Sequence, residues 1–154
     1  MEAIPAIRLA FGDNKDSAEN TIRLVVEQSF GKLVGAFEHY SEAVFEMIPT
    51  APIAKVKRGS FQRLVEASEL WREAVNVGYE DMLSPAEFTA LLSLFQKRHL
   101  LIHADGIVDA DYLQKSGDTE YFIGQRIVVR AAHAMELLVL LQKLGAKLKT
   151  FLPP

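Results

Sequence analysis

The feature that most constrains the fold is a run of apolar residues at helical spacing between residues 16 and 48. Successive members lie three or four positions apart, so at about 100° per residue they form one narrow stripe on a helix. Asp16, with Glu19 three positions later, predicts a capping box at the start of this helix, and the segment from Pro49 to Pro52 ends it. The stripe consists of Ile22, Val26, Phe30, Leu33, Phe37, Tyr40, Val44 and Ile48.

Two further segments carry the same kind of stripe. A second helix is predicted over residues 60–77, with Gly78 closing it, and a last helix over residues 131–149. In the second helix the buried positions are predicted to be Phe61, Leu64, Ser68, Trp71 and Val75. In the last helix they are predicted to be Leu137, Leu140, Leu141, Leu144 and Leu148.

The segment that begins at Ser84 has the clearest helix start in the chain. Ser84 suits the N-cap, Pro85 the first helical position and Glu87 the third, so a helix is predicted from there to about His103. Gly106 then provides a left-handed stop.

Four long amphipathic helices predict an all-α fold, a four-to-five-helix bundle in one domain over residues 1–154. A long polar connection, residues 105–125, precedes the last helix. It is expected to hold a short helix near residues 109–115, and residues 126–129 are expected to form a short strand or hairpin. The two ends are expected to be an irregular arm, residues 1–16, and a short tail, residues 150–154.

Composition excludes several classes of protein. With 17 Lys+Arg against 20 Asp+Glu, the net charge of −3 provides no overall attraction to nucleic acid or an anionic membrane, so an RNA partner needs a local patch. Cysteine is absent, which removes disulfides, thiolate zinc sites and a cysteine nucleophile, and is compatible with the reducing cytoplasm where we expect the protein. No secretory signal is recognisable, and the apolar run at residues 137–141 is too short to span a membrane.

Polar residues interrupt the apolar arc of the third helix. On a wheel the arc contains Phe88, Leu91, Leu92, Phe95 and Ile102, and Arg98 and His99 fall within it while His103 lies at its edge. A buried arginine is costly unless it is paired, because its guanidinium cannot lose its charge. The alternative is an arginine that snorkels near a helix end beside a satisfied core histidine. Three such groups within six residues favour a functional site.

The spacing of these groups suggests a second copy of the helix. His99 and His103 are four residues apart and share a face, whereas Arg98 and His103 are roughly 140° apart. A two-fold axis would bring both pairs into one cleft. Leu94, Leu100 and Leu101 lie toward or beyond the edge of the arc, so this helix is expected to bury excess apolar surface in a homodimer.

The hexapeptide RHLLIH, Arg98 to His103, and the text HADGIVDADYLQKSGDTEYFIGQRIVV that continues from His103 resemble the HEPN superfamily of all-α ribonucleases and nucleotide-binding modules. The match spans residues 84–130. The resemblance implies that Arg98 and His103 are the catalytic pair and His99 an auxiliary polar residue. It also implies a metal-independent, cofactor-free endoribonuclease that dimerises through these helices, in a toxin or antiviral-defence role with an antitoxin or regulatory protein as a further partner.

The implied chemistry is physically reasonable. Attack of an RNA 2′-hydroxyl on the adjacent phosphate needs a proton-transfer group with a pKa near neutrality, which histidine provides. It also needs a fixed positive charge on the phosphoryl oxygens, which a guanidinium provides. One departure concerns regulation: members paired with minimal nucleotidyltransferases carry a modified tyrosine two residues after the motif histidine, where this chain has Asp105.

Two basic stretches are candidates for RNA contact. Lys55, Lys57, Arg58 and Arg63 have no acid between them, and Lys143, Lys147 and Lys149 form a similar group near the end. Either stretch can equally be a solvated surface. His39 and His133 are interpreted as ordinary surface or core residues. Without cysteine or a His-Glu helix motif, and with Asp105, Asp109, Asp111 and Asp118 failing the EF-hand spacing, no metal site is expected.

Our leading interpretation is therefore a homodimeric ribonuclease that cleaves single-stranded RNA. The alternative is a catalytically inactive HEPN-like module that binds nucleotide or RNA or only dimerises. A third interpretation is a plain helical interaction domain in which Arg98 and the histidines are coincidental.

Overall fold

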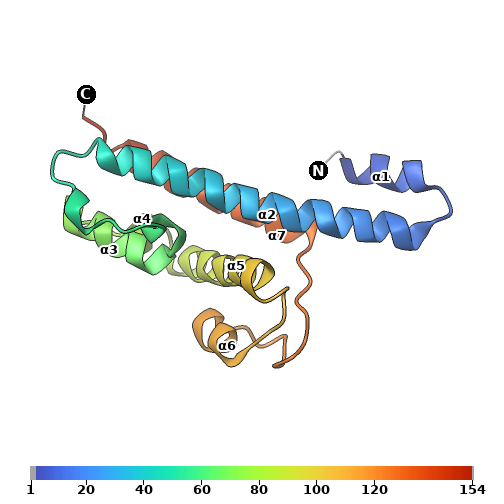
Figure 1. Ribbon diagram of the computed structural model, residues 1–154. Helices are drawn as coiled ribbons and strands as arrows, with labels where there is room; N and C mark the ends of the chain where they lie inside the picture. Colours follow the sequence, from blue (N-terminus) through green and yellow to red (C-terminus); the bar gives the residue numbers. More distant parts are fainter. Residues whose placement is uncertain (1–2, 154) are drawn as a thin grey trace.

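The computed structural model describes residues 3–153, and these residues form an all-α structure, as the sequence predicts. Across this range the chain contains no β-strand (Figure 1). In chain order the helices are α1 (Ala3–Phe11), α2 (Lys15–Glu46), α3 (Leu64–Val75), α4 (Tyr79–Met82), α5 (Pro85–His103), α6 (Ala110–Ser116) and α7 (Ala131–Lys149), with 3₁₀ turns η1 (Ile53–Lys55) and η2 (Ser60–Gln62) between α2 and α3.

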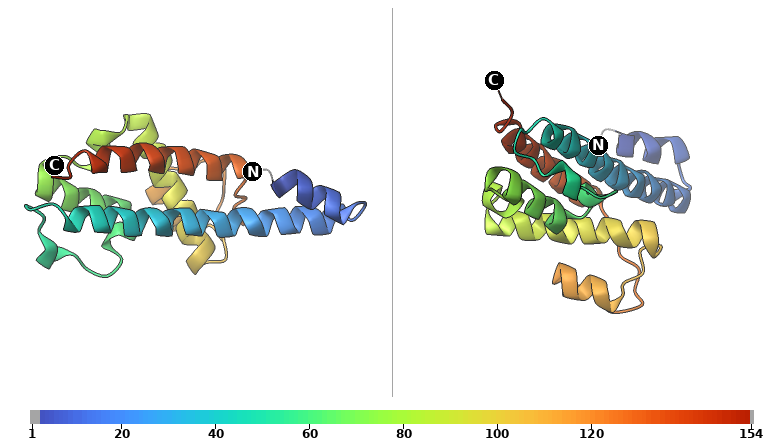
Figure 2. Two further views of the ribbon diagram at one scale, coloured as in Figure 1. Left: turned by 90° about the horizontal axis from the view of Figure 1, so that it is seen from above. Right: turned by 60° about the vertical axis from the view of Figure 1, so that its left-hand side comes forward.

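The long helices α2 and α7 lie side by side and run in the same direction (Figures 1 and 2). The Tyr40 hydroxyl on α2 donates to the carbonyl of Gly145 on α7 at 3.1 Å. Because parallel helices cannot be joined by a short turn, the chain between them must travel back along the bundle. It does so through the layer of α3, α4 and α5, and α6 lies on the far side of α5 from α2.

The apolar stripe of α2 supplies one wall of the core. Val34, Ser41 and Phe45 are buried with it, whereas Tyr40 is exposed and Leu33 is half-buried at its edge. The α3 layer closes the core through aromatic contacts, because the Phe45 ring lies 5.3 Å from that of Trp71 and 5.4 Å from that of Phe61.

The start of α2 differs from the prediction. The N-cap is Asn14 instead of Asp16, and its side chain accepts a hydrogen bond from the backbone N–H of Ser17 at 3.3 Å. Asp16 lies inside the first turn, where its negative charge favours the positive end of the helix dipole.

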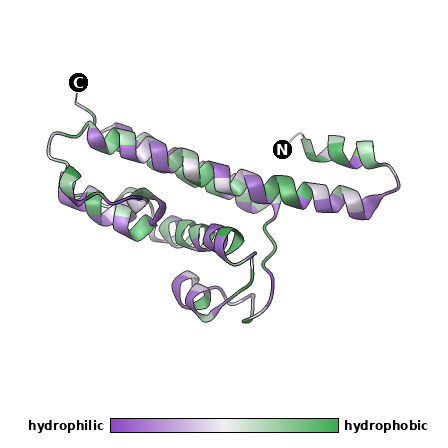
Figure 3. Cartoon of the chain, in the orientation of Figure 1, coloured by the Kyte–Doolittle hydropathy of each residue, from purple (hydrophilic) through white to green (hydrophobic). Residues whose placement is uncertain are grey.

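The prediction of an irregular N-terminal arm is wrong for residues 3–11, which form helix α1. This segment is largely apolar (Figure 3), and Ile4 and Ile7 pack against the core. The Nε atom of Arg8 pairs with Glu19 of α2 at 2.9 Å. Helix α1 therefore folds back against the first part of α2. Residues 1 and 2 of the predicted arm lie outside the described part of the chain.

The predicted helix over residues 60–77 is interrupted. Residues 60–62 form the 3₁₀ turn η2, and Arg63 is extended, with φ −98° and ψ 98°, before α3 begins. Asn76 ends α3 in the left-handed conformation, φ 61°, instead of Gly78. Gly78 has an ordinary φ of −93° and precedes α4. A glycine is therefore needed there because a side chain would not fit, and not because the backbone is left-handed.

The start of α5 agrees with the prediction. Ser84 caps it, Pro85 follows, and Glu87 closes the capping box through its side chain, which accepts from the Ser84 N–H at 2.9 Å. Gly106 adopts the left-handed conformation with φ 76°. In the connection, α6 begins after Asp109, and residues 126–129 meet the segment near Ile107 through a single antiparallel bridge and not the predicted strand.

Helix α5 is covered on two sides, and this overturns two predictions about it. It buries Leu91, Leu94, Phe95, Lys97 and Leu100, an arc of roughly 220° at 100° per residue. The predicted arc is wrong for Ile102, which is 50% exposed, and for His99, which is exposed. Leu94 and Leu100 are 3% and 2% exposed within the chain, so they leave no excess apolar surface for a partner, whereas Leu101 is half-buried.

Candidate functional site

Arg98 is a half-buried cation near the end of α5. Among the buried side-chain nitrogen and oxygen atoms of residues 3–153, only Nε of Arg98 lacks a hydrogen-bond partner. Burial lowers the pKa of Arg98 from its ordinary value, and the nearby Glu38 partly opposes this. Arginine nevertheless stays protonated at neutral pH. The protein therefore holds a partly desolvated positive charge with unused hydrogen-bonding capacity, which is a rare arrangement in a folded chain.

A small pocket of about 150 Å³ lies beside Arg98. It is formed where η2 and the start of α3 approach α5 and α6, so it joins segments far apart in the sequence. None of its lining residues is acidic. They are Gln62, Arg63, Leu64, Phe95, Gln96, Arg98, His99 and Lys115.

Two of the three cations in this lining already have carboxylate partners. Arg63 pairs with Glu66, its Nη2 lying 3.0 Å from Oε1, and Lys115 pairs with Asp111 at 2.7 Å. Arg98 has no such ion pair in the described chain. The charge available to a ligand is therefore concentrated on Arg98, with the other two cations at the pocket's walls.

His99 and His103 lie on the exposed face of α5, with ring centroids 4.6 Å apart and planes tilted by 47°. Partial burial of its ring lowers the pKa of His99, and electrostatic interactions with three neighbouring basic side chains lower it further, while Asp111 opposes the shift. His99 is therefore mostly neutral at pH 7 and able to accept a proton or a hydrogen bond. The neighbours that lower the pKa are His103, Lys115 and Arg98.

The structure brings Arg98 and His99 to one pocket, but not His103. His103 does not line the pocket. It lies beside the ring of His99, which does. This separation follows from the five-residue spacing of Arg98 and His103 on a regular helix.

The predicted RNA-binding stretch reaches the pocket only through Arg63. Lys55 pairs with Glu73 of α3 at 2.5 Å. Lys57 and Arg58 are exposed and make no ion pair with any described residue. In the second basic group, Lys143 pairs with Glu87 at 2.6 Å. A continuous basic track is therefore not formed within one protomer.

Sequence reasoning missed two lysines near the site. Lys115 lies on α6, and only the tertiary structure places it beside His99. Lys97 is 7% exposed and is enclosed by Tyr112 and Asp118. Its position directly before Arg98 was visible in the sequence, but a lysine at a helix surface is normally solvated, so no local signal marked it as buried.

His133 of α7 and the acidic residues do not suggest a metal centre. The Nδ1 atom of His133 accepts the backbone N–H of Arg130 at 3.1 Å, as an ordinary helix-start contact. Within residues 3–153 no group of three or more His, Asp or Glu side chains is arranged to hold a metal ion.

Comparison with family models, with curated proteins and with solved structures finds no match to this chain. Over the described residues, no helix combines the length and the apolar content needed to cross a membrane. A concave pocket with an under-satisfied guanidinium, a neutral imidazole and no acidic wall is suited to bind one oxyanion, such as a phosphoryl group.

Proposed function

We propose that this protein is a metal-independent endoribonuclease of the HEPN type, which cleaves single-stranded RNA as a homodimer. The observation that carries the proposal is the half-buried guanidinium of Arg98, whose Nε has no partner and which lines a pocket without acidic residues. A scissile phosphate in the pocket would accept hydrogen bonds from this guanidinium and offset its charge.

The size of the pocket agrees with this substrate. Its volume of about 150 Å³ is well below the roughly 300 Å³ at which pockets for whole drug-sized ligands begin. It can take a phosphoryl group with part of a ribose, but not a complete nucleotide. Bases would then lie outside, where Gln62 and Gln96 at the wall offer amide groups.

In the proposed reaction the RNA provides its own nucleophile. The 2′-oxygen attacks phosphorus, the bond to the 5′-oxygen breaks, and the products are a 2′,3′-cyclic phosphate and a 5′-hydroxyl. Arg98 stabilises the charge that develops on the phosphoryl oxygens. By the family resemblance, His103 transfers the proton, and His99, which lies between them, orients the phosphate and the His103 ring.

The dimer is part of the proposal because His103 lies outside the pocket of its own protomer. Ile102, beside His103, is 50% exposed, and Ile107 is 41% exposed just beyond the end of α5. A two-fold contact over this end of α5 would cover these side chains and bring a second His103 toward the site. We further propose a cytoplasmic toxin or defence role with an antitoxin or regulatory partner, by the resemblance alone.

The test is cleavage of single-stranded RNA in the presence of EDTA, with single-stranded DNA as the substrate that lacks the 2′-hydroxyl. Arg98→Ala and His103→Ala are each expected to lower the rate by about 10²–10⁴-fold, and His99→Ala by less. Arg8→Ala and His39→Ala remove the same residue types from exposed positions elsewhere and should leave the rate unchanged. Circular dichroism verifies that each variant remains helical.

Equal cleavage by the parent and by well-folded Arg98→Ala and His103→Ala variants would show that the site assignment is wrong. The second candidate function, a non-catalytic module that binds phosphate or RNA, is favoured by the position of His103 outside the pocket. It predicts that the parent binds RNA through Arg98 but releases no cyclic phosphate. If Arg98→Ala changes neither binding nor cleavage, a plain interaction domain is the better description.

A further inference from the structure

A buried ionic network connects α5 to α6 and begins at Lys97, the residue directly before Arg98. The Nζ atom of Lys97 lies 2.6 Å from Oδ2 of Asp118 and 3.1 Å from the hydroxyl of Tyr112. That hydroxyl donates to the same Oδ2 at 2.6 Å, which closes a triangle. The side chains of Lys97 and Asp118 are 9% and 6% exposed. Lys97 also lies 5.2 Å from the centre of the Tyr121 ring.

This network is poorly explained by stability alone. Removing two charges from water is costly, and well-packed apolar residues of similar size are often as stabilising as a buried ion pair. What the pair adds is structural specificity, because its charges and hydrogen bonds are satisfied in one arrangement of α6 against α5 only. Burial lowers the pKa of Lys97, but its hydrogen bonds to Asp118 and Tyr112 outweigh this and leave the pKa above its ordinary value, so the lysine stays charged.

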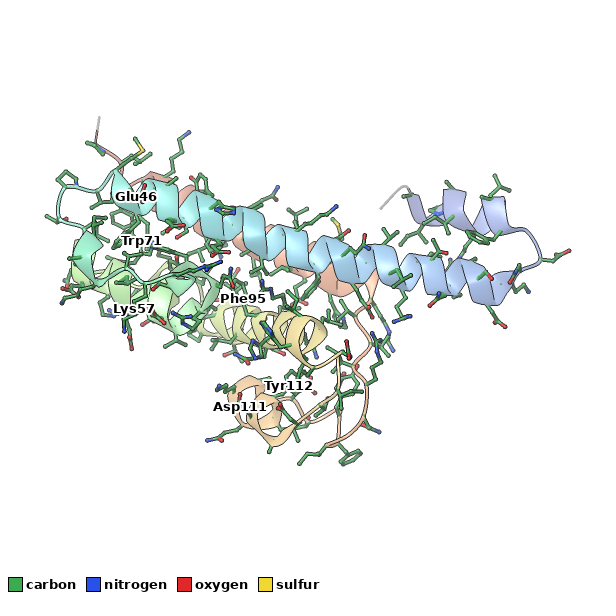
Figure 4. The ribbon with its side chains drawn as sticks, in the orientation of Figure 1. Glu46, Lys57, Trp71, Phe95, Asp111 and Tyr112 are labelled. Carbon is green, nitrogen blue, oxygen red and sulfur yellow. The ribbon has the colours of Figure 1, made fainter. Side chains whose placement is uncertain are left out.

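Helix α6 is placed both by Val108, which precedes it and is 1% exposed, and by this network, which engages the helix itself. The helix has only seven residues, and Tyr112 is its one buried side chain. In Figure 4, Tyr112 lies on the side of α6 that faces α5. Tyr112 belongs to α6 itself and Asp118 is the second residue after the helix, so Lys97 contacts both the helix and the segment that follows it.

The same short helix carries part of the phosphate pocket. Lys115 lines the pocket, and its partner Asp111 also acts on His99. The position of α6 against α5 therefore decides whether a positive side chain stands beside Arg98 and His99. Lys97 and Arg98 are adjacent in sequence, but the side chain of Lys97 bonds to α6 and the segment beyond it, whereas Arg98 lines the pocket.

We propose that Lys97, Tyr112 and Asp118 form a positioning device that docks α6 against α5 and thereby completes the oxyanion pocket with Lys115. This proposal rests on the proposed function of the pocket. The three residues touch no substrate. They act through α6, so their loss should change the electrostatic surroundings of His99 and the affinity of the pocket while α5 itself stays intact.

The decisive variant is Lys97→Met with Asp118→Asn, which removes both charges and keeps similar volumes. The pKa of His99 is measured by NMR titration, and binding of inorganic phosphate by calorimetry. We expect the His99 pKa to rise toward its ordinary value, because burial and Lys115 lower it by more than Asp111, which would move with the same helix, raises it. Phosphate affinity should fall by about two- to fivefold, the scale of one exposed charge contact.

Three further variants isolate the cause. Lys115→Ala should raise the His99 pKa in the parent and add little in the double variant, because both changes remove the same charge. Lys143→Met breaks another Lys–carboxylate pair of α5, to Glu87, and should leave His99 unchanged. Tyr112→Phe is a milder change that keeps the ion pair and should raise the His99 pKa by a smaller amount, which decides the question if the double variant loses its helicity.

A folded double variant with the parental His99 pKa and phosphate affinity would overturn the positioning role. A larger effect of Lys143→Met than of the double variant would overturn it as well. If the parent binds no phosphate and cleaves no RNA, the proposed function fails, whereas the His99 titration still decides whether Lys97 and Asp118 position α6.

Discussion

At the scale of single residues, the surroundings of a polar side chain of α5, and not its residue type, decide whether its hydrogen bonds are satisfied. Lys97 and Arg98 are neighbours, yet Lys97 finds two hydrogen-bond partners and Arg98 leaves Nε without one. Because an unsatisfied buried donor costs about 1–3 kcal/mol, the fold tolerates at Arg98 what it avoids elsewhere in residues 3–153. A cost of this kind is typical of residues that meet a ligand.

Gly78 provides a residue-scale test of the packing between α3 and α4. A Cβ at this position would lie 2.6 Å from Oγ of Ser68 and 2.8 Å from atoms of Arg72 and Glu80. Gly78→Ala should therefore destabilise the protein by about 1–3 kcal/mol through overpacking, although its φ is ordinary. The measurement is urea-induced unfolding.

Gly35→Ala is the matched control, because a Cβ there meets nothing within 4 Å and the residue lies inside α2. It should stabilise the protein by about 0.5–1 kcal/mol. If both substitutions shift the unfolding midpoint in the same direction, the crowding inferred at Gly78 is incorrect.

At the scale of elements, α5 shows how local and tertiary interactions meet in one side chain. Glu87 closes the capping box of α5, and its Oε1 atom also accepts a hydrogen bond from Nζ of Lys143 on α7 at 2.6 Å. The hydrogen bond from Lys143, followed by those from Ser84, lowers the pKa of Glu87 to about 2. The start of the helix that carries the candidate site is thus attached to α7 by the residue that closes its capping box.

This attachment predicts a pH dependence of stability. The folded pKa of Glu87 is below its ordinary value of 4.5, so its contribution is complete above about pH 4.5 and is lost as the pH falls toward 2. Unfolding free energies of Glu87→Gln and the parent should differ most above pH 5 and converge near pH 2. A difference that stays constant over this range would contradict the lowered pKa.

At the scale of the whole molecule, the layout decides which surfaces remain for a partner. The parallel pair α2 and α7 covers one side of α5, and α6 covers another, so Leu91, Leu94 and Leu100 are buried within the chain while Leu92 and Leu101 are half-buried. What stays accessible is the end of α5, where Ile102 and His103 meet solvent. A dimer that completes the site must use this end.

Ile102→Glu tests that expectation. The new charge should prevent association, so sedimentation at micromolar concentration should show a monomer that retains phosphate binding at Arg98 but loses RNA cleavage. Val139→Glu, at a side chain 57% exposed on α7, introduces the same charge elsewhere and should remain dimeric. A parent protein that is monomeric under these conditions would count against the dimeric enzyme.

Much of the secondary structure follows from the sequence because the determining interactions are local. Helical periodicity identifies α2, α5 and α7, and the Ser84–Glu87 box fixes where α5 begins. Gly106 is left-handed as predicted, but Asp105 before it, with φ 49°, is the first left-handed residue after the helix. The sequence also singles out Arg98, His99 and His103 as polar groups in an apolar pattern, but the structure leaves His99 outside the buried arc and His103 outside the pocket. Each of these signals acts within one or two helical turns.

Only the tertiary structure decided which faces are buried and which residues meet. A helical wheel gives the angle of a side chain but not the number of elements that cover the helix, so the burial of Leu94, Lys97 and Leu100 was not predictable. The pocket draws on positions from Gln62 to Lys115, which no periodicity relates. The sequence by itself determined the helices and the polar groups they carry, and long-range packing, which depends on contacts between distant segments, determined the site that those groups form.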